Sequence, residues 1–348
     1  MKELIEGSQA VVRAAVNAGC NFFAGYPITP SSEIAHELAK TLPKLGGIFI
    51  QMEDEIASIN AIIGASMAGA RSMTATSGPG LSLMQEAIGY AAITETPIVI
   101  IDVMRAGPAT GIPTFPSQGD VQAACYGSHG DYPVVVLSPA TIIETYYLTY
   151  KAFEIAERYL VPVIVLIDEI TAHMKEGVEL PPIKYNIYKP SRKFVGNGLR
   201  RHTTGLIHGE DGMPLSDPKK YHEIIKQLVK KIHDPAVMMM ETEGDRNPEI
   251  LFVTYGITCR AAKAAIYKMQ KRGMSAGLVR LKTVFPFPEE EISRIIRKGV
   301  KKIIVPEMNM GQVLKEVQRI ANNICEVISI TSLARLMSPD LLIEMSLK

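Results

Sequence analysis

The sequence predicts an α/β protein with a doubly wound parallel sheet and a second, smaller α/β domain. Helix-like and strand-like stretches alternate from residue 7 to about 180, a rhythm typical of parallel sheets. The strands read as continuous apolar runs, such as PIVIIDVM at 97–104 and VPVIVLI at 161–167. Such runs are expected where helices cover both faces of a sheet.

The elements follow in order along the chain. We expect strands of the main sheet near 22–26, 47–51, 72–76, 97–104, 133–137 and 162–167. Apolar residues recur between them at helical spacing, as at Ile56, Ile59, Ile63 and Met67.

The alternation breaks at about 178–246, where Pro- and Gly-containing stretches precede a charged, helix-like run at 219–233. A second alternating unit follows, with strands expected near 250–254, 275–281, 301–306 and 325–330. We therefore divide the chain into a first domain at 1–180, a connecting region at 181–246 and a second domain at 247–348.

Composition excludes several classes of partner. Lys plus Arg is 37 and Asp plus Glu is 36, for a net charge of +1, which offers no electrostatic footprint for nucleic acid or an anionic membrane. The apolar runs are too short to span a bilayer. The first residues mix Lys2, Glu3 and Glu6 without an apolar segment after them, so we expect no secretory signal and a cytoplasmic protein.

Four cysteines, Cys20, Cys125, Cys259 and Cys325, lie far apart and form no CxxC pair. This spacing encodes neither a zinc site nor an iron–sulfur motif. We expect no metal site in this chain, so any cluster must come from another subunit.

Ligands of open parallel sheets lie outside the carboxyl ends of the strands, and two loops there carry polar candidates. The first is GYPITPSSE at 25–33. Thr29 as an N-cap with Pro30 at the first helical position explains it without a ligand, although a helix N-terminus also suits an anion. The second places Glu53, Asp54 and Glu55 at a helix start, where acids ordinarily just complement the helix dipole.

Two further loops follow the next strands. TATSGPGLSLMQE at 74–86 passes through a Gly-Pro-Gly turn, which lets backbone approach a ligand but matches neither GxGxxG nor a Walker loop. In the loop at 102–120, Arg105 follows a buried strand and could hold a carboxylate through its planar fork, unless it is a solvated surface residue. We expect turn-forming or structural roles for the remaining polar candidates, which are His129, Asp131, His202, His208, Glu307 and Asn309.

Together, these loops resemble the alpha subunits of the 2-oxoacid:ferredoxin oxidoreductases. The matching segments lie in the same order at 26–32, 53–58, 76–84, 105–110, 118–120, 204–206, 281–288 and 307–312. The resemblance implies that the first domain is like the pyrimidine-binding domain of thiamine diphosphate enzymes. It also implies that the second domain is like the C-terminal domain of transketolase.

The resemblance also implies roles for individual residues. The family's activating glutamate precedes a helix glycine by nine residues, an interval that Glu55 and Gly64 keep, so Glu55 is favoured over Glu53 and Asp54. Thr29 and Arg105 correspond to the residues that reach the 2-oxoacid. The residues expected to contact the cofactor are Tyr26, Pro27, Glu55, Ser77 and Gly78.

The implied partners follow from what the chain lacks. Thiamine enzymes hold the diphosphate through Mg²⁺ with a GDG motif, and this sequence has none. Thiamine diphosphate is therefore expected to be shared with a beta-type subunit, with Mg²⁺ and iron–sulfur clusters on partner chains. Gamma and ferredoxin-like delta subunits, ferredoxin and coenzyme A complete the expected partners.

The stretch RAGPATGIPTFPSQGD at 105–120 looks closest to subunits that act on 2-oxoglutarate. Oxidative decarboxylation of 2-oxoglutarate to succinyl-CoA and CO₂ is therefore the expected reaction. Three alternatives stay open: the same enzyme class with 2-oxoisovalerate or pyruvate, half of a thiamine decarboxylase that uses no ferredoxin, and a non-catalytic scaffold subunit. The second domain argues against the decarboxylase, and the presence of Glu55, Thr29 and Arg105 argues against the scaffold.

Overall fold

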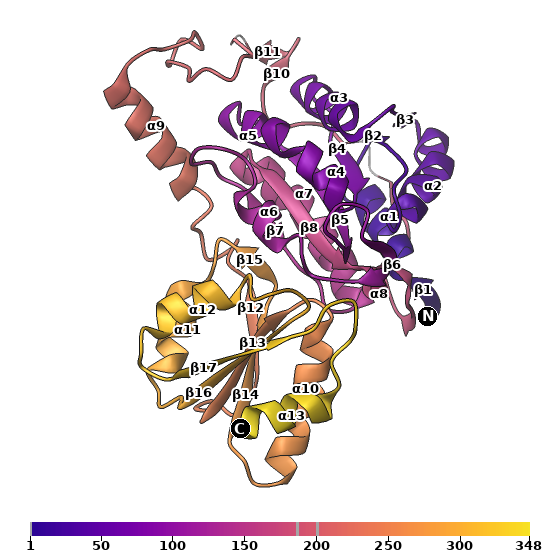
Figure 1. Cartoon of the computed structure of the whole chain (residues 1–348). Coiled ribbons are helices and arrows are strands. Elements are labelled where there is room, and N and C mark those ends of the chain that lie inside the picture. The colour runs from indigo at the N-terminus through magenta and orange to yellow at the C-terminus, as the bar shows by residue number, and fades with distance from the viewer. Residues whose placement is uncertain (1, 186–187, 200–201) are drawn as a thin grey trace.

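A computed structural model describes residues 2–185, 188–199 and 202–348. Two mixed sheets lie side by side, each flanked by helices (Figure 1). The main sheet has the strand order β15-β7-β8-β5-β4-β2-β3, with β6 paired to β5 outside this path. Its strands are β2 (Phe22–Gly25), β3 (Ile48–Gln51), β4 (Ser72–Thr76), β5 (Ile98–Ala106), β6 (Ile112–Pro116), β7 (Val135–Leu137), β8 (Pro162–Asp168) and β15 (Thr283–Phe285).

The main sheet is doubly wound, as expected. Strands β2, β3, β4, β5, β7 and β8 pair in parallel, and each coincides with a strand predicted from an apolar run. One face packs on α1 (Gly7–Asn17), α2 (Ser32–Thr41) and α7 (Ile142–Tyr159). The other packs on α3 (Glu55–Met67), α4 (Gly78–Leu83), α5 (Gln85–Ile93) and α6 (Val121–Tyr126).

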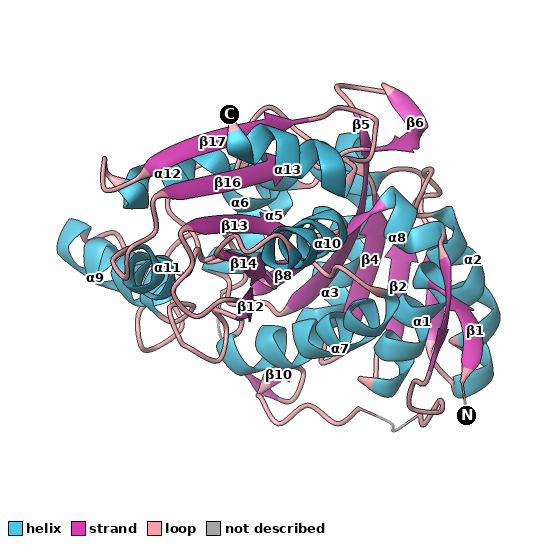
Figure 2. Ribbon diagram, turned by 90° about the horizontal axis from the view of Figure 1, so that it is seen from below, coloured by secondary structure: helices cyan, strands magenta, loops and turns pink. Residues whose placement is uncertain are grey.

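The second sheet has the order β12-β14-β13-β16-β17 (Figure 2). Its strands are β12 (Met240–Gly244), β13 (Ile250–Tyr255), β14 (Ala276–Leu281), β16 (Lys302–Glu307) and β17 (Glu326–Thr331). Helices α10 (Thr258–Lys271) and α13 (Pro339–Leu347) pack on one face, and α11 (Glu289–Ile296) and α12 (Leu314–Ala321) pack on the other. Four strands were expected. The structure adds β12, an antiparallel edge strand that lies inside the segment expected to connect the domains.

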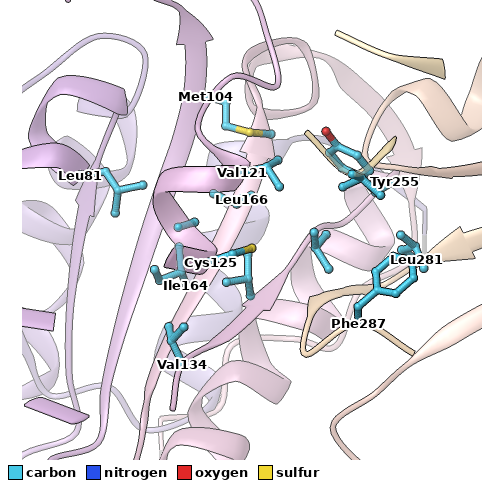
Figure 3. Close-up of a cluster of buried hydrophobic side chains, with 14 of the residues drawn as sticks. Leu81, Met104, Val121, Cys125, Val134, Ile164, Leu166, Tyr255, Leu281 and Phe287 are labelled. Carbon is cyan, nitrogen blue, oxygen red and sulfur yellow. The ribbon is translucent and has the colours of Figure 1, made fainter. Parts of the chain in front are cut away.

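The two sheets share one hydrophobic core. Strand β15 of the second unit pairs antiparallel with β7 of the main sheet. A continuous cluster of buried side chains runs from Leu81, Cys125 and Ile164 in the main sheet's layer to Tyr255 and Phe287 in the second (Figure 3). This shared core places the second domain firmly against the carboxyl-end loops of the first.

The remaining elements are short or peripheral. Helix α9 (Pro218–Lys230), expected from the charged run at 219–233, runs along the outside of the molecule (Figure 1). The others are η1 (Pro43–Leu45), α8 (Glu169–His173), the pair β1 (Glu3–Glu6) and β9 (Lys175–Val178), and the pair β10 (Phe194–Val195) and β11 (Gly198–Leu199). Within the described ranges, no helix is both long and apolar enough to cross a membrane.

Candidate active site

Four neighbouring strands bring the predicted loops to one edge of the main sheet. Strands β5, β4, β2 and β3 are adjacent and parallel, so their carboxyl ends point the same way. Arg105 lies at the carboxyl end of β5, and Ser77, Thr29 and Glu55 follow β4, β2 and β3. The sheet order therefore gathers these candidates, which are widely separated in sequence, into one region.

The three consecutive acids have different surroundings. Glu53 is exposed, and Asp54 is the N-cap of α3, where its Oδ1 accepts a 2.7 Å hydrogen bond from the amide of Ala57. Glu55 is only 6% exposed. The dipole-complementing role thus belongs chiefly to Asp54, while Glu55 turns into the protein.

Glu55 lies between α3 and the turn after β4. A Cβ built on Gly80 would lie 2.7 Å from its Oε1 and 2.1 Å from the Thr76 hydroxyl, so the missing side chain at Gly80 makes room for both. Within the described part of the chain, no group hydrogen-bonds or ion-pairs with the Glu55 carboxylate. Its oxygens are not among the fully buried polar atoms, so they remain accessible to a group from outside the chain.

Packing within the protein explains why glycine occupies positions 78 and 80 of this turn. A Cβ on Gly78 would lie 3.0 Å from Oδ1 of Asp120, so Gly78 admits that carboxyl group as Gly80 admits Glu55. Ser77 is fully buried. The hydroxyls of Thr76 and Ser77 have no hydrogen-bond partner among the described residues, and such unsatisfied polar atoms call for a specific explanation.

Thr29 is not the N-cap of the following helix, so that interpretation was wrong. Helix α2 begins at Ser32, because Ser31 first closes a turn in which its amide donates to the carbonyl of Ile28 at 2.8 Å. The carbonyl of Thr29 instead accepts a 2.8 Å hydrogen bond from Nη1 of Arg105. The Thr29 side chain is exposed, as are Tyr26 and Pro27 beside it.

Arg105 is a buried cation, not a solvated surface residue. It lies near the end of β5 and is 6% exposed. Its Nε has no hydrogen-bond partner, and its guanidinium makes no ion pair within the described ranges. Its positive charge lowers the pKa values of the neighbouring carboxyls of Asp102 and Asp120, but neither carboxyl forms an ion pair with it among the described residues, so the guanidinium can still bind an anion from outside.

A buried carboxyl pair, Asp102 and Asp120, lies behind the turn and was not identified from the sequence. Burial, followed by the charge of Asp120, holds the pKa of Asp102 well above its usual range. Burial also raises the pKa of Asp120 to about 6. The pair therefore retains a proton at pH values at which isolated carboxyl groups are ionised. The signal in the sequence was a single charge inside the apolar run PIVIIDVM.

The other polar candidates lie elsewhere. His129 and Asp131 line a cavity of about 560 Å³ beside α5 and α9 that contains none of the site residues above. His202 and His208 are neighbours in the connecting region, with ring centroids 6.2 Å apart. Glu307 and Asn309 are buried where the two domains meet, in the structural role expected for them.

The site fits one half of a thiamine-type cofactor. The carboxylate of Glu55 can accept from a ring N–H, and the hydroxyls of Thr76 and Ser77 lack partners at the same edge. The described residues contain no group of three or more His, Cys, Asp or Glu side chains placed to hold a metal ion. The residues present thus suit the pyrimidine end of the cofactor.

Two family models cover nearly the whole chain. Residues 13–243 match "Pyruvate flavodoxin/ferredoxin oxidoreductase, thiamine diP-bdg", and residues 248–340 match "Pyruvate:ferredoxin oxidoreductase core domain II". The chain belongs to the 2-oxoacid:ferredoxin oxidoreductases, as an alpha-type subunit with a thiamine diphosphate-binding domain.

Within that family, the chain is similar to 2-oxoglutarate synthase subunits. It is 55% identical over 345 residues to 2-oxoglutarate synthase subunit KorA of Archaeoglobus fulgidus, covering 98% of this chain and 97% of the relative. The corresponding KorA subunit of Methanocaldococcus jannaschii is 45% identical, covering 94% and 93%. A ketoisovalerate oxidoreductase subunit VorB of Methanothermobacter thermautotrophicus is 38% identical, covering 91% and 89%.

Solved structures agree with these relatives. The 2-oxoglutarate:ferredoxin oxidoreductase of Magnetococcus marinus, solved with 2-oxoglutarate, coenzyme A and succinyl-CoA bound, superposes with a TM-score of 0.89 at 32% identity. The match covers 99% of this chain and 64% of that longer chain. A split-gene transketolase superposes with a TM-score of 0.63 at 15% identity, which confirms the expected thiamine-enzyme fold alone.

Proposed function

We propose that this chain is the alpha-type subunit of a 2-oxoglutarate:ferredoxin oxidoreductase. The enzyme would convert 2-oxoglutarate and coenzyme A to succinyl-CoA and CO₂ while reducing ferredoxin. The observation that carries this proposal is the buried, unpartnered Glu55 beside a turn with free hydroxyls, at the same edge of the sheet as the buried Arg105. The similarity to KorA subunits supports 2-oxoglutarate as the substrate.

Glu55 is the residue that would engage the cofactor. Its carboxylate would hold a proton at N1′ of the aminopyrimidine, with Tyr26, Pro27, Ser77 and Gly78 around the ring. Thiamine diphosphate, when bound, supplies the electron sink that decarboxylation of a 2-oxoacid requires. The protein's part is orientation and placement of charge, which the tight packing of Glu55 against Gly80 supports.

Arg105 and Thr29 would hold the substrate. The Arg105 guanidinium would bind the carboxylate at C1, the group that all 2-oxoacids share, and Thr29 lies next to it. Since Nη1 is already engaged by the Thr29 carbonyl, the guanidinium is fixed before substrate arrives. The C1 carboxylate would then meet a preoriented cation in a largely buried setting, where charge interactions are stronger than in water.

Partner subunits would complete the site. The sequence lacks GDG, and several large apolar side chains on the site's elements are exposed: Tyr26, Ile56, Leu83, Ile112 and Phe115. Exposed apolar patches of this kind mark interaction surfaces. We infer that a beta-type subunit covers them and brings Mg²⁺, and that iron–sulfur clusters lie on beta-type or delta-type chains of a cytoplasmic complex. The chain would be divided functionally at 1–180, 181–246 and 247–348.

Reconstitution of the complex tests the proposal. The chain co-expressed with the beta-type, gamma and delta subunits should reduce viologen with 2-oxoglutarate and coenzyme A. Calorimetry of the isolated chain with thiamine diphosphate and Mg²⁺ should show weak binding or none. A higher kcat/KM for 2-oxoisovalerate than for 2-oxoglutarate or pyruvate would move the protein to the branched-chain group, to which VorB relatives belong by name. Tight cofactor binding by the isolated chain would contradict the shared site.

A further inference from the structure

The loop that carries Arg105 is held at its two ends and exposed between them. Residues 107–115 are mostly exposed, whereas residues 116–118 are buried. At the start of the loop, Arg105 is bonded to the Thr29 carbonyl and lies opposite Pro116 in the β5–β6 pair. The placement of Arg105 therefore depends on where the returning end of the loop is fixed.

That returning end, residues 117–122, is fixed by the second domain. Its partner is the segment 307–312, which follows β16 and which we call the clamp. The amide of Gln118 donates to the carbonyl of Met308 at 2.9 Å, and the amide of Met308 donates to Oε1 of Gln118 at 3.0 Å. Further bonds run from Asn309 Nδ2 to the carbonyl of Gln118 at 2.8 Å and from Ser117 Oγ to the carbonyl of Met308 at 3.2 Å.

Gln312 closes the clamp from the other side. Its Nε2 donates to the carbonyl of Gly119 at 2.7 Å, and its Oε1 accepts from the amide of Gln122 at 2.8 Å. Backbone groups of the loop end are thus bound by both functional atoms of one side chain. Unlike Gln118, Gln312 is only partly buried, so its substitution disturbs the core less.

The clamp is rigid in its own right. The carboxylate of Glu307 is fully buried and accepts from the amides of Val313 and Leu314, both at 2.9 Å, at the start of α12. Oδ1 of Asn309 accepts from the amides of Gly311 and Gln312 at 2.8 and 3.0 Å. Gly311 has a φ of +85°, a conformation that glycine adopts at little cost. The clamp can therefore impose its position on the loop end.

We propose that Asn309 and Gln312 are positioning residues for the 2-oxoacid: by fixing residues 117–122, the second domain sets the place of Arg105 and thereby the enzyme's affinity for substrate. This inference rests on the proposed function of Arg105. The same loop end carries Asp120, whose carboxyl group lies against Gly78. The clamp therefore also fixes Asp120, and an Arg105 displaced with the loop end would hold the substrate carboxylate less well.

The test compares Gln312→Met with Glu144→Gln in the reconstituted complex. Methionine preserves side-chain length and apolar packing while removing both hydrogen bonds. Glu144→Gln weakens a different contact between the domains, the ion pair with Arg280, and does not touch the loop.

Loss of one or two neutral hydrogen bonds should raise the KM for 2-oxoglutarate by about tenfold in Gln312→Met. Because uniform binding is lost, kcat should change by less than about twofold. Glu144→Gln should leave KM unchanged.

Amide exchange gives a second readout. In Gln312→Met, deuterium exchange at the amides of Gln118 and Gln122 should be faster than in the wild-type complex, and in Glu144→Gln it should not. An unchanged KM in Gln312→Met, or an equal increase in Glu144→Gln, overturns the inference. Should Gln312→Met fail to assemble, Gln312→Glu keeps the acceptor for Gln122 and loses only the donor to Gly119. A KM unchanged in that variant overturns the inference equally.

The inference and the proposed function fail in different ways. If the wild-type complex does not oxidise 2-oxoglutarate, the proposed substrate is wrong. The same comparison of Gln312→Met with Glu144→Gln is then made with the 2-oxoacid that the complex does oxidise. If wild type oxidises 2-oxoglutarate normally and Gln312→Met keeps its KM, only the clamp inference is wrong.

Discussion

Glu55 is set apart from its acidic neighbours by the absence of a partner. Asp54 accepts a hydrogen bond from the Ala57 amide, and Glu53 is exposed. Glu55 is buried and unpaired among the described residues. A carboxylate so placed stays ready to accept a hydrogen bond from a ring nitrogen without first breaking another.

Replacing Glu55 by Gln tests this role directly. The neutral amide keeps the shape but stabilises a proton at N1′ poorly, so exchange of the thiazolium C2 proton should slow by about 10² to 10⁴-fold. Deuterium exchange followed by NMR on the assembled complex measures it. Glu53→Gln is the matched control and should exchange at the wild-type rate. Equal rates in wild type and Glu55→Gln would show that another group activates the cofactor.

Arg105→Lys tests the proposed binding of the C1 carboxylate of the substrate. Lysine keeps the charge but lacks the planar fork, and hydrogen bonds to charged groups contribute about 1.5–3 kcal/mol. The KM values for 2-oxoglutarate, pyruvate and 2-oxoisovalerate should therefore all rise, by about 10- to 100-fold. Steady-state viologen assays with each acid supply the comparison. An increase for 2-oxoglutarate alone would assign Arg105 to the distal carboxylate instead of the C1 carboxylate.

At the scale of the element, two glycines in adjacent helices make opposite predictions. A Cβ on Gly80 of α4 would overlap Thr76 and Glu55, whereas one on Gly64 of α3 meets nothing within 4 Å. Gly80→Ala should therefore lower the free energy of unfolding by about 1–3 kcal/mol through overpacking and displace Glu55. Gly64→Ala should raise it by about 0.5–1 kcal/mol, because alanine favours the helix.

Urea unfolding of the isolated chain measures both substitutions. C2 proton exchange in the assembled complex adds the functional readout, which should slow in Gly80→Ala. Equal stability changes in the two variants would mean that the turn after β4 yields to accommodate a methyl group, and that Gly80 does not fix the position of Glu55.

The element scale also shows what the sequence reveals and what it does not. Most parallel strands of both sheets were predictable because they are apolar runs, such as IVIIDVMRA in β5 and PVIVLID in β8. Strands β12 and β15 were not, since METEG and TVF carry no such signal and gain their place only by pairing with β14 and β7. Glu55 could be singled out only by resemblance, because its burial depends on Gly80, in a different loop.

At the scale of the whole molecule, Asp168 ties the domains together in a pH-dependent way. It ends β8 in the first domain and accepts a 2.7 Å hydrogen bond from the amide of Ile257 in the second. Burial raises the pKa of Asp168 to about 7. Between about pH 4 and 7, the folded protein therefore holds a proton that the unfolded chain has lost. Binding of this proton contributes to the free energy of unfolding. The contribution is fully present below the pKa of Asp in the unfolded chain and is lost as the pH rises through about 7.

Asp168→Asn removes that dependence while keeping an oxygen for the Ile257 amide. The free energy of unfolding of the variant, relative to wild type, should increase from about pH 4 to about pH 8. The increase should be up to about 4 kcal/mol, from about three pH units at about 1.4 kcal/mol each. Because Asp102 and Asp120 titrate in both proteins, the difference isolates Asp168. A difference that is independent of pH would show that Asp168 is ionised in the folded protein throughout this range.

Strand β15 has a consequence for how the chain is made. The edge of the main sheet at β7 is completed by Thr283–Phe285, and residues 117–122 are hydrogen-bonded to residues 307–312. When only the first domain has been synthesised, its sheet therefore has an open edge at β7. Open edges can pair with strands of other chains. Until residues 283–312 have been synthesised, we therefore expect the first domain to be prone to edge-to-edge association.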